Sequence, residues 1–100
     1  MIGDPGAIRA LARPLRQRAE EIRDLGDRLV AQAHTTSWEG LAAEAMRSAV
    51  RHSAAGLRRT AALHDDAADA LERHADHVAT AQATIRAAVH ALKDALGALG

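Results

Sequence analysis

The sequence predicts an all-α protein: an antiparallel helical hairpin that dimerises into a four-helix bundle, with the second helix longer than the first. Three observations support this fold class. Alanine and arginine, both strong helix formers, dominate the composition, and Lys93 is the single lysine. No glycine or proline lies between Gly56 and Gly97. Apolar residues recur at helical spacing on both sides of Trp38, the one aromatic residue.

The composition also limits the classes of function. A length of 100 residues predicts one helical-hairpin domain, residues 1–100. A net charge of +0 and the lack of Phe and Tyr argue against a nucleic-acid partner. The lack of cysteine excludes disulfides and thiolate metal sites. We expect neither a membrane span nor a cleaved signal peptide, because no apolar run is long enough and the start lacks the required pattern.

The first helix is predicted to begin after Asp4, as N-cap, and to fade at Ala33-His34-Thr35. Pro14 predicts a bend, or a start near Arg13, because proline inside a helix costs about 3 kcal/mol. Gly26 costs about 1 kcal/mol relative to alanine, so either a partner helix approaches closely there or the weakness is tolerated. Large residues form the apolar stripe and small ones widen it: Ile8, Leu11, Leu15, Ile22, Leu25 and Leu29, with Ala12, Ala19, Gly26 and Ala33.

Trp38 lies where the helical pattern breaks. Thr36 and Glu39 match a capping box that would begin the second helix. Trp38 would then occupy the first turn of this helix, with its ring folded over the end of the first helix. Gly40 would let the backbone pass close beside the ring, because glycine has no Cβ.

The second helix is predicted to run unbroken from Trp38 to Leu96, roughly twice the length of the first, with a break at Asp65-Asp66 as the alternative. Two positions recur every seven residues, which is typical of a coiled-coil seam. One is mostly large and the other mostly small: Val50, Leu57, His64, Leu71, Val78, Ile85, Leu92 and Leu99; and Met46, Ser53, Thr60, Ala67, His74, Ala81, Ala88 and Ala95. The last turns have no partner within the chain, so we expect pairing with a second hairpin.

The charged and histidine residues suggest no catalytic chemistry. An acidic group on the second helix would be either a solvated surface or a means of registering two subunits: Asp65, Asp66, Asp69, Glu72 and Asp76. The six histidines lack a ligand constellation, so no metal or other cofactor is predicted. No nucleophile–base pair or phosphate-binding loop is present, and we therefore predict that the protein is not an enzyme.

The motif Trp38-Glu39-Gly40, centred between two amphipathic helices, resembles the WXG family of small proteins handled by type VII (ESX) secretion. The resemblance covers the whole chain by architecture and one short motif by sequence. It implies a partner that is either a second copy or another WXG-like hairpin. It also implies secretion by the type VII route, from the cytoplasm and without a cleaved signal peptide. The Ala- and Arg-rich composition resembles that of an actinobacterial source.

The export signal of that family, Tyr-x-x-x-Asp/Glu near the end of helix two, is absent because the chain has no Tyr. His90 and Asp94 keep its spacing and share one helix face. They are either a candidate signal, read by a secretion ATPase at the C-terminal end, or an ordinary exposed pair. Two other functions stay open: a cytoplasmic coiled-coil adaptor that is never exported, and the N-terminal targeting domain of a longer secreted toxin.

Replacing the indole tests the hairpin prediction. We expect Trp38→Ala to lower the free energy of unfolding by about 3–5 kcal/mol if the ring is buried against the first helix. Denaturant unfolding measures this loss. An unchanged unfolding curve would mean that the ring faces solvent.

Overall fold

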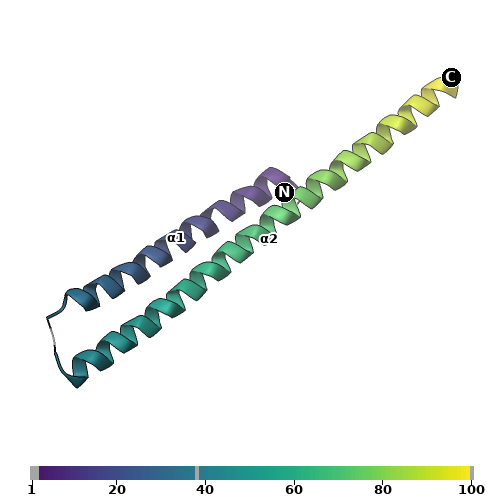
Figure 1. Cartoon of the computed structure of the whole chain (residues 1–100). Helices are drawn as coiled ribbons and strands as arrows, with labels where there is room; N and C mark the ends of the chain where they lie inside the picture. The colour runs from purple at the N-terminus through teal and green to yellow at the C-terminus, as the bar shows by residue number, and fades with distance from the viewer. Residues whose placement is uncertain (1–2, 38, 100) are drawn as a thin grey trace.

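The computed structural model describes residues 3–37 and 39–99 and contains two helices, α1 (Pro5–Thr35) and α2 (Leu41–Leu99). They lie antiparallel as a hairpin (Figure 1), and no strand occurs among the described residues. The 59 residues of α2 continue through the predicted alternative break and far exceed the 31 of α1. The radius of gyration is 24.6 Å, against about 13 Å for a compact chain of this length. The predicted all-helical class with a longer second helix is confirmed.

The start of α1 agrees with the predicted cap. The Asp4 side chain accepts a hydrogen bond from the Gly6 backbone N–H at 2.9 Å, and Pro5 takes the first helical turn. The expected start near Arg13 is wrong, because α1 runs from Pro5 through Pro14 without interruption. Proline leaves the carbonyl of Ala10, four residues earlier, without its usual donor. Both residues are exposed, so water can satisfy that carbonyl.

The turn is built differently from the predicted capping box. α1 ends at Thr35 as expected, but Thr36 then caps this end, where its hydroxyl and its backbone N–H both donate to the Gln32 carbonyl. α2 begins only at Leu41, and the carbonyl of Gly40 accepts the first bond of the helix. Gly40 has φ +97°, a conformation that residues with a Cβ rarely adopt. Its backbone angle therefore accounts for glycine here. The predictions for Trp38 lie outside the described residues.

Small residues form the contact between the helices. Four residues at seven-residue spacing on each helix are buried there, and we call this set the alanine seam: Ala12, Ala19, Gly26 and Ala33 of α1, with Ala54, Ala61, Ala68 and Ala75 of α2. Small side chains let two backbones approach closely, since the distance between helix axes depends on the residues at the contact. The large apolar residues are consequently kept out of the centre of the hairpin, and among the described residues no large side chain is fully buried.

The structure distinguishes the two interpretations of Gly26, a close approach of a partner helix and a tolerated weakness in the helix. It is buried in the seam, yet a Cβ placed on it would lie 3.7 Å from the Ala54 carbonyl oxygen and 3.8 Å from the Leu57 Cβ. These are ordinary van der Waals separations. The close approach of α2 therefore does not require glycine at this position, and the weakness in helix propensity is tolerated.

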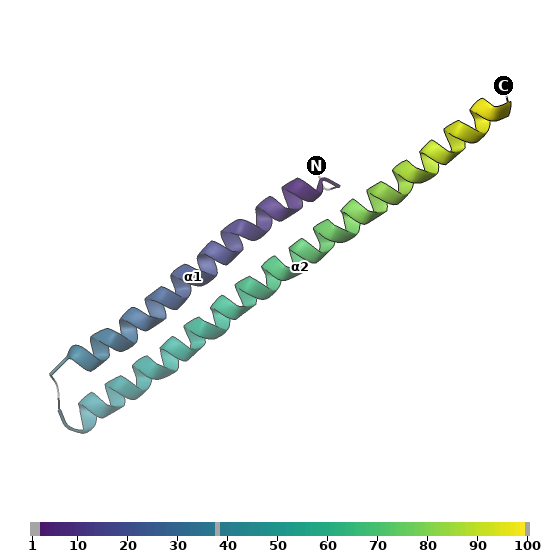
Figure 2. The ribbon, with the colours of Figure 1, turned by 45° about the horizontal axis from the view of Figure 1, so that its top comes forward.

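α2 continues well beyond the start of α1 (Figures 1 and 2). The Gln82 side-chain amide of α2 donates a hydrogen bond to the Gly3 carbonyl, just before the start of α1. Every described residue from 83 to 99 is exposed. We call residues 83–99 the extension. At 1.5 Å per residue it is about 25 Å of helix that no described residue covers.

A bulky residue in the alanine seam should separate the helices. We expect Ala61→Leu to lower the free energy of unfolding by about 1–3 kcal/mol, because the buried methyl leaves no room for a larger side chain. Ala62→Leu is the matched control, since that neighbouring residue is exposed and leucine is a good helix former. Equal unfolding curves for the two variants would contradict the seam.

Candidate functional site: an open apolar face

One side of the hairpin carries a row of large apolar residues that the chain covers only in part. They occupy one heptad position on each helix, beside the alanine seam, and are half-buried: Leu15, Ile22 and Leu29 of α1, with Val50, Leu57, His64, Leu71 and Val78 of α2. Leu11 and Leu25 of α1 extend the row outward and are 61% and 46% exposed. We call this set the open face. A leucine side chain that stays half exposed loses a good part of the roughly 1.5–3 kcal/mol of stabilisation that full burial provides.

The predicted seam residues lie on this face. Ile8 is buried in the hairpin, whereas the large heptad series of α2 is half-buried as far as Val78 and exposed at Ile85 and Leu92. The small series needs a correction: Ser53, Thr60, Ala67 and His74 are exposed, and Met46 is half-buried. The small position buried in the hairpin falls one residue later, in the alanine seam. His74 and Leu11 therefore do not lie in the contact between the two helices of the hairpin. Their place in a seam between two subunits stays a prediction.

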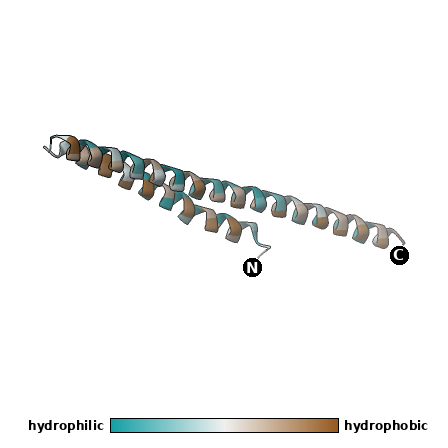
Figure 3. Cartoon of the chain, turned by 90° about the horizontal axis from the view of Figure 1, so that it is seen from below, coloured by the Kyte–Doolittle hydropathy of each residue, from teal (hydrophilic) through white to brown (hydrophobic). Residues whose placement is uncertain are grey.

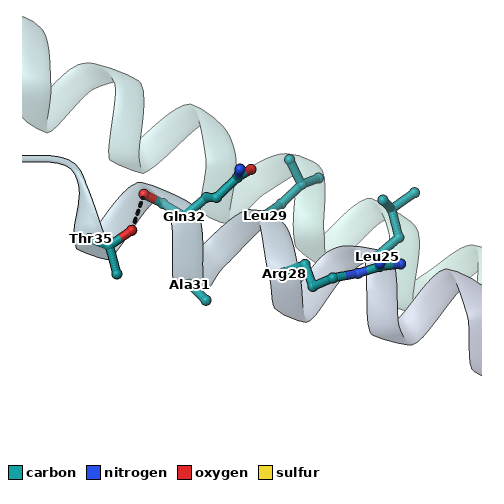
Figure 4. A pocket seen from close by; sticks show the side chains of 6 residues that line it. All are labelled: Leu25, Arg28, Leu29, Ala31, Gln32 and Thr35. Atoms are coloured by element: carbon teal, nitrogen blue, oxygen red, sulfur yellow. Dashed lines mark hydrogen bonds between the residues drawn. The ribbon is translucent and has the colours of Figure 1, made fainter.

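Two open grooves mark the turn end of this face. One, of about 510 Å³, is lined by six residues of α1 (Figure 4): Leu25, Arg28, Leu29, Ala31, Gln32 and Thr35. The other, of about 400 Å³, lies between the helices and shares Leu29, Gln32 and Thr35 with the first, while Met46 and Val50 line it from α2. Neither encloses a small molecule as a ligand pocket does. They suit apolar side chains from a docking helix.

The opposite side of the seam carries ion pairs between the helices. Arg9 contacts Asp76 at 2.9 Å, and Arg16 contacts Asp69 at 2.7 Å, so a step of seven residues forward on α1 is a step of seven back on α2. Arg23 contacts Asp65 at 2.6 Å. Most of the predicted acidic group is therefore engaged inside the chain. Exposed pairs contribute little energy each, but their spacing favours one antiparallel register.

Arg16 is the most connected of these arginines. Its guanidinium donates from Nη2 to Asp69 and from Nε to Glu72 at 3.0 Å. These hydrogen bonds raise the pKa of Arg16 above its usual value, Asp69 contributing most. The pKa of an arginine already lies far above neutral pH, and these hydrogen bonds raise it further. Arg16 therefore stays positively charged throughout the pH range in which proteins fold.

Arg47 joins the two helices at the turn. Its side chain is 20% exposed and occupies the heptad position that alanine takes from Ala54 to Ala75. The guanidinium donates to the carbonyls of Ala33 and Thr36, at 3.4 and 3.2 Å, which lie at the end of α1 and would otherwise lack intrahelical partners. This role of Arg47 was not predicted from the sequence. The signal that could have indicated it is an arginine one heptad before a run of four alanines at the same position.

The extension continues the apolar pattern without cover. Hydrophobic residues recur turn after turn along it (Figure 3), at alternating spacings of four and three: Ile85, Val89, Leu92, Leu96 and Leu99. They repeat the heptad positions of the large α2 series and of the alanine seam. Leu92 is 60% exposed and Leu99 is 85% exposed. The two apolar surfaces are thus one continuous stripe along α2.

The candidate export residues also lie in the extension. His90 and Asp94 are both exposed, one helical turn apart. Both heptad positions fall outside the apolar stripe: His90 takes the position of Asp69, which contacts Arg16 of α1, and Asp94 takes that of Asp66, which is exposed. Whether the pair acts as a signal stays a prediction.

The described residues contain neither a cluster of metal ligands nor a helix that could span a membrane. No cluster of three or more His, Asp or Glu side chains there could hold a metal ion. In the same residues, neither helix contains a stretch apolar enough to cross a bilayer.

Comparison with known proteins gives one match. A family model described as a putative T7SS secretion signal domain, where T7SS denotes the type VII secretion system, matches residues 1–98. No curated protein and no solved structure matches the chain. The match covers both helices, the open face and nearly all of the extension.

Proposed function

Since the chain belongs to the family of putative T7SS secretion signal domains, we propose that it is a non-enzymatic export module that acts by association with a second helical protein. In this proposal the chain resides in the cytoplasm before export. It then leaves by the type VII route, without a cleaved signal peptide. The partner is a second copy or another WXG-like hairpin, and the assembly is a four-helix bundle. The WXG resemblance at Trp38 and Gly40 is part of the proposal.

The observation that carries this proposal is the open face. A hairpin closed by alanines buries little apolar area, and a chain of 100 residues has a limited core of its own. The large residues that would add stability lie beside the seam, half-covered and on one side. Two such faces packed together would bury them, as the facing stripes of a four-helix bundle do.

Charge on the open face should weaken association. We expect Leu11→Glu with Leu25→Glu to lower affinity for the partner by about tenfold or more, since two partly exposed leucines would no longer be buried. Leu41→Glu with Leu63→Glu is the matched control: both leucines are exposed but lie off this face. Sedimentation and native mass spectrometry measure assembly, for the chain alone and co-expressed with neighbouring small helical proteins. A monomer under both conditions would refute the association.

Export is tested separately. In cells that carry a matching type VII system, we expect the tagged chain to reach the medium only when the secretion ATPase is intact. His90→Ala with Asp94→Ala should reduce export by about tenfold or more while leaving association unchanged, because one helix face presents both side chains. Asp66→Ala with His77→Ala, two exposed residues of the same types, is the control. Normal export of the first variant would show that the pair is not the signal; no export at all would favour the cytoplasmic adaptor.

The targeting-domain alternative fits the family description as well. A signal domain directs whatever is joined to it, so the same module can serve a small secreted protein or a longer toxin. Fusing a folded reporter after residue 100 separates the two uses. Export of the fusion, dependent on the ATPase, would support the targeting function, and export of the chain alone would limit it to a small substrate.

A further inference from the structure

A polar pair interrupts the open face at its middle. His64 is half-buried and is the one polar member of the face, with a leucine one heptad to either side. Arg18 of α1 falls midway between the two exposed leucines of the face, at their heptad position. A Cβ placed on Gly26 would lie 3.8 Å from the Leu57 Cβ, so Arg18, eight residues earlier, comes level with the residue after His64. The two polar side chains therefore lie at the same height on the hairpin.

The hydrogen bond of His64 determines which ring nitrogen takes up a proton. Its Nδ1 lies 2.8 Å from the Thr60 carbonyl oxygen. A carbonyl oxygen only accepts, so Nδ1 carries the hydrogen and Nε2 is the atom that gains a proton in acid. Protonation then turns the ring from one donor and one acceptor into two donors with a positive charge.

The acid next to His64 in sequence is already engaged. Asp65 binds Arg23 at 2.6 Å and lies 3.9 Å from Arg16, on the opposite side of the alanine seam. Its carboxylate is thus held by two arginines of α1 and does not balance a charge on the open face.

On the open side, the charged neighbours of His64 come from α1. Arg18 is exposed, and no ion pair joins it to a described residue. Glu21, one turn along α1, is also exposed, and its heptad position lies farther from the seam. The long side chain of Arg18 can keep its guanidinium in water at the rim of a contact, whereas the shorter imidazole cannot. A proton on His64 would add a second positive charge near Arg18.

We propose that His64 makes association through the open face sensitive to acid: a partner covers the face while the imidazole is neutral and is released when the ring is protonated. The proposal rests on the proposed association, which it deepens by naming its regulation. Covering the face takes the ring out of water between two leucines, where a charged imidazole needs a partner. The open face has no acidic member, so a second copy that presents the same face brings no carboxylate to this point.

The dependence of assembly on pH tests the proposal. The assembly of the full chain, formed alone or with a co-expressed small helical protein, is followed by sedimentation at about pH 7.5 and pH 5, which lie on either side of the ordinary titration of histidine and above that of Asp and Glu. We expect the Kd to rise by about tenfold or more in acid. His64→Gln keeps a polar side chain but does not titrate, so its Kd should change by less than about threefold. His64→Leu should assemble more tightly than the wild type at both pH values.

His77→Gln is the matched control, because this histidine is exposed and takes the heptad position of Leu63, off the open face. It should show the same loss of affinity in acid as the wild type. An equal Kd of the wild type at the two pH values overturns the proposal, as does an equal loss in the His64→Gln variant. Tighter assembly in acid also overturns it, since the partner would then place a carboxylate against His64. Absence of assembly at both pH values would instead refute the association itself, so the two failures can be told apart.

Discussion

The close approach of two helices through a line of small residues determines most of this structure. Because the alanine seam occupies the centre of the contact, larger side chains can lie only beside it. On one side the neighbours are arginines and acids, which pair across the helices. On the other side they are leucine, isoleucine and valine, which are half-buried. The hairpin thus has a side that is complete within the chain and a side that is not.

The charged side defines how the helices are aligned. Ion pairs between exposed groups contribute modestly, so the apolar contacts must supply most of the stability. A slip of one heptad would re-form some of these pairs, because they too repeat every seven residues, but it would leave Arg9 or Asp76 without its partner. The buried alanines alone repeat every seven residues and would fit several registers. Arg47 adds a further constraint, since its guanidinium reaches the last carbonyls of α1 from a fixed place on α2.

The helices could be predicted from the sequence because their signals are local. Asp4 before a proline, a heptad pattern and a stretch without glycine or proline depend only on neighbouring residues. The turn could not, because Thr36 and Glu39 fit a capping box while the same threonine can cap the preceding helix, as it does. The local pattern does not indicate which of the two helices Thr36 caps. The φ of +97° at Gly40 likewise follows from the path of the turn.

Which small residues of α2 pack against α1 could not be predicted, for a related physical reason. Two series of small residues flank its large series, and both repeat every seven residues. The series that starts at Met46 includes Ser53, Thr60 and His74, whose polar groups would be costly to bury without partners. The series of alanines from Ala54 to Ala75 has no such cost and matches the small residues of α1. Comparing the polarity of the two series, rather than their size, would have selected the correct one. The predicted group of open-face residues did not depend on that choice.

The unequal lengths of the helices then separate two kinds of contact. Along the hairpin, a partner meets a stripe that α1 already half covers, so shape and apolar area dominate recognition there. Along the extension, a partner meets the entire stripe, because every described residue there is exposed. Asp94 lies on the side of the helix turned away from the stripe, whereas His90 takes the heptad position of Asp69, which contacts α1 along the hairpin. A partner that docked on the extension in the manner of α1 would therefore contact His90 and leave Asp94 accessible.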